Sequence, residues 1–408
     1  MRAKNVLMVA LAFLIPLQMS SIYGRCPFCT AVSQTFTQEM EQVDIVAIGI
    51  MIEPPPPLDE TRVFDPEAES FAIFKIQKTL QGRTLYDETK PVKIPYFGEG
   101  KKGEIFLIMA TEPLNLLWHP PLRINERVAE YLPKLEKLPK EGADRLAFFQ
   151  EYLEDSDELL RADAYDEFAN ADYAAVIALK PKMHHDQLVS WINDPQIPAA
   201  RHRLYLTMLG VCGNDDDVIM LEKLIRSGSE ESKAALDSMV ACYLTLGGPE
   251  SLDLIDDLFF ENKDSPHSET YSAIMALRFH GTEADVIPRE RLIVSLRYLL
   301  DRPSLADLVI PDLARWEDWE SVDKMVQLFK DSDESTSWVR VPIINYLRAC
   351  PLPEADTHIV ALEKIDPEAV RRANTFFLFS GGGRIQGTVD ADKTGADKEG
   401  SDKKEIKQ

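Results

Sequence analysis

Small or helix-ending residues recur at nearly equal spacing through the second half of the chain. Gly213, Gly247 and Gly281 are 34 residues apart, and Cys350 follows after two further steps of similar length, with residues 315–316 between them. Each lies near the end of an apolar helical stretch. A fixed period of this size is typical of stacked helical hairpins, none of which can bury its apolar face alone. We therefore expect a region of α-helical repeats.

Acidic residues follow most of these points, where the next helix is expected to begin. Asp and Glu are favoured at a helix N-terminus because they accept hydrogen bonds from its free N–H groups and offset the helix dipole. This explains most of the carboxylates as capping residues. The expected acidic starts are Asp215 to Asp217, Pro249-Glu250, Glu283 to Asp285, Trp319-Glu320 and Pro353-Glu354.

A first helical hairpin is expected earlier, over Ala143–Leu153 and Glu158–Ala171. The run DSDELLRADAYDEFA in its second helix resembles the HEAT-repeat signature, with a Leu-Arg pair, a small Ala and a bulky Phe168. The run DSDESTSWVRVPIINYL repeats the theme. The resemblance implies that residues 125–379 form a HEAT-like solenoid of six to seven helical pairs. Tetratricopeptide repeats share the period, but their Trp-Leu-Gly-Tyr pattern is absent.

The residues before this region have the pattern of β-strands. One amphipathic helix is expected over Thr30–Gln42. Four strand-like segments follow, separated by turns and without crossover helices, which indicates an antiparallel meander or small barrel. In the second segment Ala72, Phe74 and Ile76 share one face, and Gly82 ends it. The four segments are Val43–Ile52, Glu69–Leu80, Val92–Phe97 and Glu104–Ala110.

This β-region resembles the netrin-like, or tissue-inhibitor-type, version of the OB barrel. The resemblance rests on the paired cysteines Cys26 and Cys29 and on the strands DIVAIGIM, FAIFKIQKTLQG and GEIFLIMA. It implies a netrin-like domain over residues 25–113, joined by a connector at 114–124 to the helices. The family places further cysteines late in the barrel, and this chain has none between Cys29 and Cys212. Some members inhibit proteases through an N-terminal cysteine, but Arg25 before Cys26 obstructs that geometry.

The two ends of the chain are expected to lie outside the folded domains. Arg2 and Lys4 precede an apolar run, and small residues follow before Arg25, so residues 1–24 read as a signal peptide. The run is too short for a comfortable membrane span. We expect an exported protein, periplasmic or secreted, with an uncleaved N-terminal anchor as the alternative. Residues 380–408 lack apolar periodicity and are expected to be disordered.

The overall charge limits the classes of partner. The chain has a formal net charge of −23 and a sequence pI near 4.8. A surface this acidic repels phosphate backbones and anionic membranes. We therefore expect no nucleic-acid partner and no stable membrane insertion after signal cleavage. The expected partner is another protein.

The motif Cys26-Pro27-Phe28-Cys29 is the one sequence feature that suggests chemistry. It matches the Cys-Pro-aromatic-Cys site of glutaredoxin-like proteins, where a helix N-terminus favours the thiolate. No strand precedes it here, so a structural disulfide that holds the start of the mature chain to the β-domain is the favoured interpretation. The alternative is a thiol–disulfide redox module. We expect the thiols of Cys212, Cys242 and Cys350 to be buried and unpaired.

No other residues form a catalytic or metal-binding pattern. His184 and His185 are adjacent and point about 100° apart on a helix, so they do not readily face one ion. A metal site would need further ligands, and His202 is the nearest candidate. We favour the interpretation that His184 and His185 are surface residues at the start of a helix. The aromatic residues Trp316, Trp319, Trp338 and Tyr346 are expected to fill the layers between hairpins, with an exposed aromatic patch for a partner as the alternative. We expect no metal and no cofactor.

Taken together, these features predict an α+β multidomain protein, with a small antiparallel OB-like barrel or meander followed by an α-helical solenoid. The helical period, the signal sequence and the missing catalytic pattern favour a non-enzymatic binding or scaffold protein. The redox module at Cys26 and Cys29 is kept as the alternative function.

Overall fold

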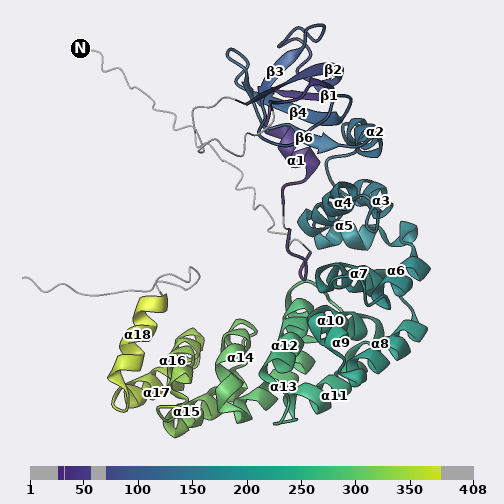
Figure 1. The fold of residues 1–408 in the computed structure, drawn as a ribbon. Helices are drawn as coiled ribbons and strands as arrows, with labels where there is room; N and C mark the ends of the chain where they lie inside the picture. The colour runs from purple at the N-terminus through teal and green to yellow at the C-terminus, as the bar shows by residue number, and fades with distance from the viewer. Residues whose placement is uncertain (1–25, 32, 57–69, 378–408) are drawn as a thin grey trace, which may run out of the picture. The chain divides into compact units, whose positions relative to one another are not determined.

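The computed structural model describes residues 26–31, 33–56 and 70–377, with side chains to residue 374. The expected signal peptide and C-terminal tail lie outside these residues. The described chain combines an antiparallel sheet with a long series of helices, which confirms the α+β prediction. The chain divides into two compact units, residues 1–298 and 299–408, and each is described by itself (Figure 1).

The first unit contains an antiparallel sheet that forms a nearly closed barrel. Its order is β3-β2-β1-β4-β5, and β6 also pairs with β4. The alternation in β2 is confirmed, because Ala72, Phe74 and Ile76 join Phe106 and Ile108 in the core. The strands are β1 (Ile45–Glu53), β2 (Phe71–Gln81), β3 (Val92–Pro95), β4 (Ile105–Thr111), β5 (Leu117–Trp118) and β6 (Leu122–Ile124).

Two local predictions for this part of the chain are wrong. The expected connector at 114–124 contains β5 and β6, which extend the sheet by pairing with both ends of β4. The expected helix over residues 30–42 is reduced to α1 (Phe36–Glu41). Thr35 begins it with a capping box to Gln38. Ser33 and Gln34, directly before Thr35, stay non-helical because two main-chain N–H groups, those of Ser33 and Phe36, bond to another part of the chain.

Helices follow the sheet without interruption by further strands in the described chain. The hairpin predicted over residues 143–171 is confirmed as α3 and α4. The helices of the first unit are α2 (Glu126–Leu135), α3 (Ala143–Gln150), α4 (Glu158–Asn170), α5 (Tyr173–Ala178), α6 (His185–Ile192), α7 (Ala199–Cys212), α8 (Asp215–Ser227), α9 (Glu230–Ala234), α10 (Leu236–Gly247), α11 (Leu252–Ile255), α12 (His267–Thr282) and α13 (Arg289–Arg297).

The repeated glycines lie near the ends of helices, as the sequence predicts. Gly213 caps the C-terminus of α7, Gly247 is the last residue of α10 and Gly281 lies in the last turn of α12. These three helices pack side by side in one row, with α10 between α7 and α12 (Figure 1). Helix α8 lies outside this row and packs against α10. One acidic start is wrong: residues 283–285 form a turn, and α13 begins at Arg289 after Pro288.

The second unit repeats this arrangement. Helices α14, α16 and α18 pack in one row, and α15 packs against α16 and α17. Trp316 and Tyr346 are buried as expected, and Trp319 packs against Tyr346. Trp338 is 48% exposed, so it does not belong to the core. The helices are α14 (Pro303–Arg315), α15 (Val322–Asp331), α16 (Arg340–Ala349), α17 (Pro353–Glu363) and α18 (Pro367–Phe377).

Candidate functional site

Cys26 and Cys29 form a disulfide, and the loop that it closes lies on the helices. The main-chain N–H of Cys26 donates to the carbonyl of Ala171, the residue that caps the end of α4, at 3.1 Å. The ring of Phe28 packs against Phe279 of α12, with 5.2 Å between ring centroids. We expected this disulfide to hold the start of the mature chain to the β-domain. It is attached to the helical region instead.

The surroundings of the disulfide differ from those of a reactive redox cysteine. Cys26 is 3% exposed, whereas Cys29 is partly exposed. A helix N-terminus favours a thiolate only within its first turn, and α1 begins only at Phe36. The helix end beside Cys26 is the C-terminus of α4, whose free carbonyls disfavour a negative charge. Cys26 is therefore neither exposed to solvent nor placed at a helix N-terminus, and both features favour an attacking thiolate.

Residues 26–31 and 33–36 then lie along the helices and lead to α1. Figure 1 shows this dark purple segment passing beside α4 and α5. The N–H of Ser33 donates to Asp166 Oδ2 at 3.2 Å, and the N–H of Phe36 donates to Asp163 Oδ1 at 2.7 Å. Residues three apart on a helix lie on the same face. Two carboxylates of α4 therefore hold the main chain of one extended segment, which we call the N-terminal segment.

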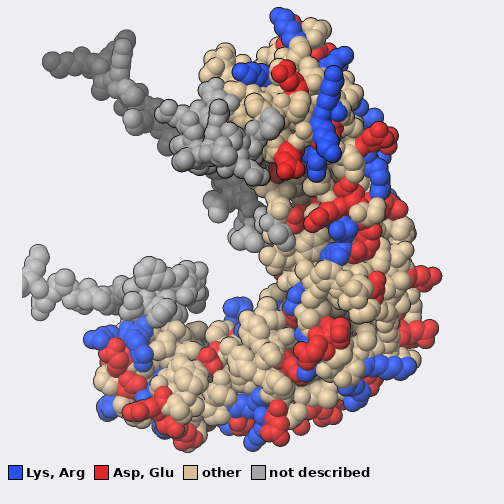
Figure 2. All heavy atoms as spheres, in the orientation of Figure 1, with Lys and Arg blue, Asp and Glu red and all other residues tan. Residues whose placement is uncertain are grey.

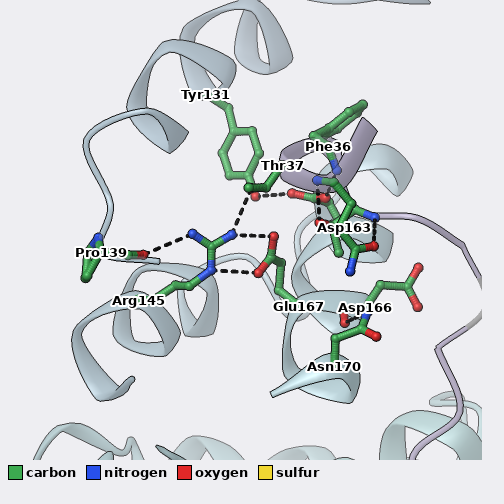
Figure 3. Close-up of polar contacts among 11 residues, drawn as sticks. Phe36, Thr37, Tyr131, Pro139, Arg145, Asp163, Asp166, Glu167 and Asn170 are labelled. Atoms are coloured by element: carbon green, nitrogen blue, oxygen red, sulfur yellow. Dashed lines mark hydrogen bonds and ion pairs between the residues drawn. The ribbon is translucent and has the colours of Figure 1, made fainter. Parts of the chain in front are cut away.

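A buried polar network surrounds the point where the N-terminal segment enters α1 (Figure 3). The hydroxyl of Tyr131, in α2, donates to Asp163 Oδ2 at 2.5 Å. Burial raises the pKa of Asp163 to about 7, while the bonds from Tyr131 and Phe36 act in the opposite direction. Burial is also the main cause that raises the pKa of Tyr131. Asp163 therefore joins α2, α4 and the start of α1.

Arg145 forms the second half of this network (Figure 3). Its guanidinium binds Glu167 of α4 through two hydrogen bonds, at 2.8 and 2.6 Å. It also donates to the carbonyl of Pro139 at 3.1 Å and to the hydroxyl of Thr37 at 2.8 Å. Arg145 and Glu167 are each 7% exposed. A two-point guanidinium–carboxylate pair fixes orientation, so Arg145 positions α1 against α3 and α4.

A cavity of about 1070 Å³ lies beside this network. Its walls come from α1, the end of β2, the turn between α2 and α3, and the helices α3, α4 and α5. Carboxylates outnumber cationic groups among the lining residues, since Lys140 and Arg145 are the two cations. The acidic lining residues are Glu41, Glu136, Glu141, Glu167 and Asp172.

The histidine pair lies at the start of α6, as predicted, and its two rings have different partners. His184 lies 3.6 Å from Glu151, whereas His185 contacts Asp217 of α8 at 2.8 Å. The pKa of His185 is raised, first by its bond to Asp217. His202 is buried and contacts two main-chain carbonyl groups. Within the described ranges, no group of three or more His, Cys, Asp or Glu residues could hold a metal ion.

The remaining cysteines are free thiols, as expected. Cys242 and Cys350 are buried, and Cys212 is partly buried. Burial raises the pKa of Cys212 to about 11 and also raises that of Cys242. Thiols with raised pKa values are poor nucleophiles because little thiolate is present. A packing role accounts for them.

Charge is unevenly distributed along the chain. Residues 70–124, which contain most of the strands, carry eight Lys and Arg and five Asp and Glu. Residues 125–377 carry 48 Asp and Glu and 27 Lys and Arg. The negative charge therefore belongs to the helices, and Figure 2 shows acidic side chains recurring over those of the first unit.

The sequence did not single out Tyr131, Arg145, Asp163, Asp166 and Glu167. Their position in the sequence gave the available signal. Asp163, Asp166 and Glu167 lie inside α4 and not at its start, where acidic capping residues are expected. Comparison with protein-family models, curated proteins and solved structures gives no match to this chain. Among the described helices, none has the length and apolar character needed to cross a membrane.

Proposed function

We propose that this chain is an exported, non-enzymatic scaffold protein that binds another protein through the surface of its helical repeats. The observation that supports this most directly is the N-terminal segment. Helices α4 and α12 already hold an extended stretch of polypeptide through main-chain hydrogen bonds and one aromatic contact. A surface that binds its own chain in this way is suited to bind another.

The proposed architecture is a netrin-like or OB-like domain followed by a HEAT-like solenoid. Helices α7, α10 and α12 form a row whose ends carry the glycines of the 34-residue period. Stacked helical pairs build extended surfaces that bind macromolecules. The six-stranded antiparallel sheet is compatible with an OB-type barrel. The acidic helices favour a protein partner over a nucleic acid.

Export is part of the proposal and rests on the residues before Cys26, which lie outside the described structure. An oxidising compartment is consistent with the disulfide between Cys26 and Cys29. The anchored form, with an uncleaved N-terminus, is the alternative location. Fractionation of cells into periplasm, membrane and medium distinguishes the two.

The test of the scaffold role is crosslinking in living cells followed by mass spectrometry. A photoreactive residue replaces Tyr271 in α12 or Ile219 in α8, which are 40% and 54% exposed. A recurrent protein adduct at one of these positions supports the proposal. Phe97 in the sheet region, 69% exposed, gives a matched control position. The absence of adducts at every helical position, together with turnover of a substrate, contradicts it.

The second candidate function is a thiol–disulfide redox module, which the partial exposure of Cys29 favours. An insulin-reduction assay compares the wild type with Cys26→Ser and with Cys212→Ser. Activity that is lost in Cys26→Ser and kept in Cys212→Ser supports the redox function. If all three proteins reduce insulin only at the same background rate, the redox function is rejected.

A further inference from the structure

The N-terminal segment lies on the helices as a peptide lies on a receptor. Between the disulfide and Thr35 its main chain is recognised more than its side chains, because the side chains of Thr30, Ser33 and Gln34 are exposed. Extended peptides are commonly held in this way, with main-chain bonds for affinity and few side-chain pockets for specificity. The main-chain donors are Cys26, Ser33 and Phe36, and their acceptors are the carbonyl of Ala171 and the carboxylates of Asp166 and Asp163.

One aromatic side chain, that of Phe28, anchors the N-terminal end of the segment. Phe28 packs on Phe279 of α12, and Phe279 also contacts Tyr173 of α5, with 5.3 Å between ring centroids. Tyr173 and Phe279 are buried. Central aromatic anchors of this kind dominate the affinity of many interfaces. The disulfide closes the turn that carries Phe28 and so limits the conformations of the anchor before it docks.

The acceptors on α4 are arranged to receive an extended main chain. Asp163 and Asp166 are 5% and 3% exposed. Burying carboxylates to this extent is costly unless donors meet them. The N–H groups of Ser33 and Phe36 are among those donors. Because these donors are main-chain groups, a segment of different sequence satisfies the same carboxylates.

We propose that α4, α5 and α12 form a docking surface for an extended polypeptide segment with one aromatic anchor. The described residues of the N-terminal segment, 26–31 and 33–36, occupy this surface as an intramolecular ligand, and a segment of the same chemistry from a partner protein takes it by displacing them. The displacement leaves α4, α5 and α12 intact and opens only the first turn of α1, since the N-terminal segment is held by main-chain bonds and by the rings of Phe28 and Phe36. This inference rests on the proposed protein-binding function and names the surface and the kind of partner.

The first test measures binding of a synthetic peptide to the full chain. The peptide has the sequence of residues 26–37 with its disulfide formed, and it carries a fluorophore for anisotropy. In the wild type, the linked segment competes at a high effective concentration. In Phe28→Ala the competitor is weakened, so the peptide binds about tenfold more tightly than to the wild type. The same peptide with Phe28→Ala is the matched control and binds weakly to both proteins.

The second test follows the displaced segment by hydrogen exchange with mass spectrometry. An isotope-labelled peptide is added in excess to the wild-type chain. The amides of Ser33 and Phe36 in the protein then exchange faster, while those of α7 and α10 keep their protection. Circular dichroism confirms that Phe28→Ala retains its helices.

Two results overturn the inference: no peptide binding to Phe28→Ala, or binding that leaves exchange at Ser33 and Phe36 unchanged. Failure of the scaffold role gives a different result. If crosslinking in cells recovers a partner while the peptide does not bind, protein binding stands at another surface. If the peptide binds and no partner is recovered, the docking surface stands and the scaffold role loses its support.

Discussion

Asp163 accepts the main-chain N–H of Phe36 at 2.7 Å, across 127 positions of sequence. This bond marks the residue at which the extended N-terminal segment becomes α1. The same carboxylate accepts the hydroxyl of Tyr131. One side chain of α4 therefore links the entry to the sheet region with the first helix after it, and the charge of Asp163 affects both.

Replacing Asp163 with Asn should change how stability depends on pH. Burial raises the pKa of Asp163 to about 7 from 3.8. The folded state therefore holds this proton more tightly than the unfolded state, so its contribution to stability is largest at acid pH. That contribution falls as pH rises from about 4 to about 7 and is then constant.

In Asp163→Asn this loss is absent, because the amide is neutral and still offers an oxygen to Phe36. We expect the variant to gain roughly 2 to 3 kcal/mol relative to wild type between pH 5 and pH 8. Glu167 raises the pKa of Asp163 and Arg145 lowers it, so both shape the slope. Thermal scans at both pH values measure the effect. Asp144→Asn, at an exposed carboxylate beside Lys182, is the control; a wild-type-like slope in Asp163→Asn contradicts the assignment.

Breaking the pair of Arg145 and Glu167 should be strongly destabilising. Arg145→Met leaves the carboxylate of Glu167 buried without its two-point partner, which costs about 3–5 kcal/mol. Replacing both residues with apolar ones should cost less than the sum of the single changes. Urea unfolding of the four proteins measures this coupling. Arg226→Met, which breaks an exposed pair with Glu222, should cost less than about 1 kcal/mol. If Arg145→Met and Arg226→Met lose the same free energy of unfolding, the prediction is refuted.

The sequence predicts the elements of this fold better than their long-range contacts. The strand alternation of β2 and the helix ends at Gly213 and Gly247 are local patterns, and the structure contains both. The strands β5 and β6 were missed because they are only two and three residues long, and β6 directly follows two prolines. Such short strands exist only because β4 provides pairing partners, and local propensity carries no signal of this.

The position of the N-terminal segment could not be predicted for the same reason. Its residues favour a helix by pattern, but their N–H groups bond to Asp163 and Asp166 far along the sequence. Tertiary contacts override weak local propensity. The carboxylates of α4 gave a partial signal, since acids in the middle of a helix that packs on both sides need donors. The sequence does not indicate which donors these are.

Replacing Gly82 with Ala should destabilise the sheet region. Gly82 has φ of +76°, and a Cβ there would lie 2.2 Å from the carbonyl oxygen of Asp44. The backbone would have to move, because a carbonyl cannot yield as a flexible side chain does. Gly103 also has a positive φ, of +98°, but its Cβ would meet nothing within 4 Å.

We therefore expect Gly103→Ala to lose about 1 kcal/mol through its backbone conformation alone. Gly82→Ala should lose at least about 2 kcal/mol, since steric overlap is added to the same backbone cost. Chemical denaturation of the two variants in parallel measures the difference. Equal losses would show that the contact with Asp44 relaxes without cost.

Removing the disulfide should loosen the N-terminal segment without unfolding the helices. In a variant with Cys26→Ser and Cys29→Ser, the turn that carries Phe28 gains conformational freedom, and docking on Phe279 becomes entropically less favourable. We expect the amides of Ser33 and Phe36 to exchange about five- to tenfold faster, which corresponds to about 1 to 1.4 kcal/mol of lost docking free energy. Hydrogen exchange with mass spectrometry measures this. Cys212→Ser, at a free thiol of α7, should leave these amides unchanged. If the double variant exchanges at the wild-type rate, the hydrogen bonds to Asp163 and Asp166 hold the segment without help from the disulfide.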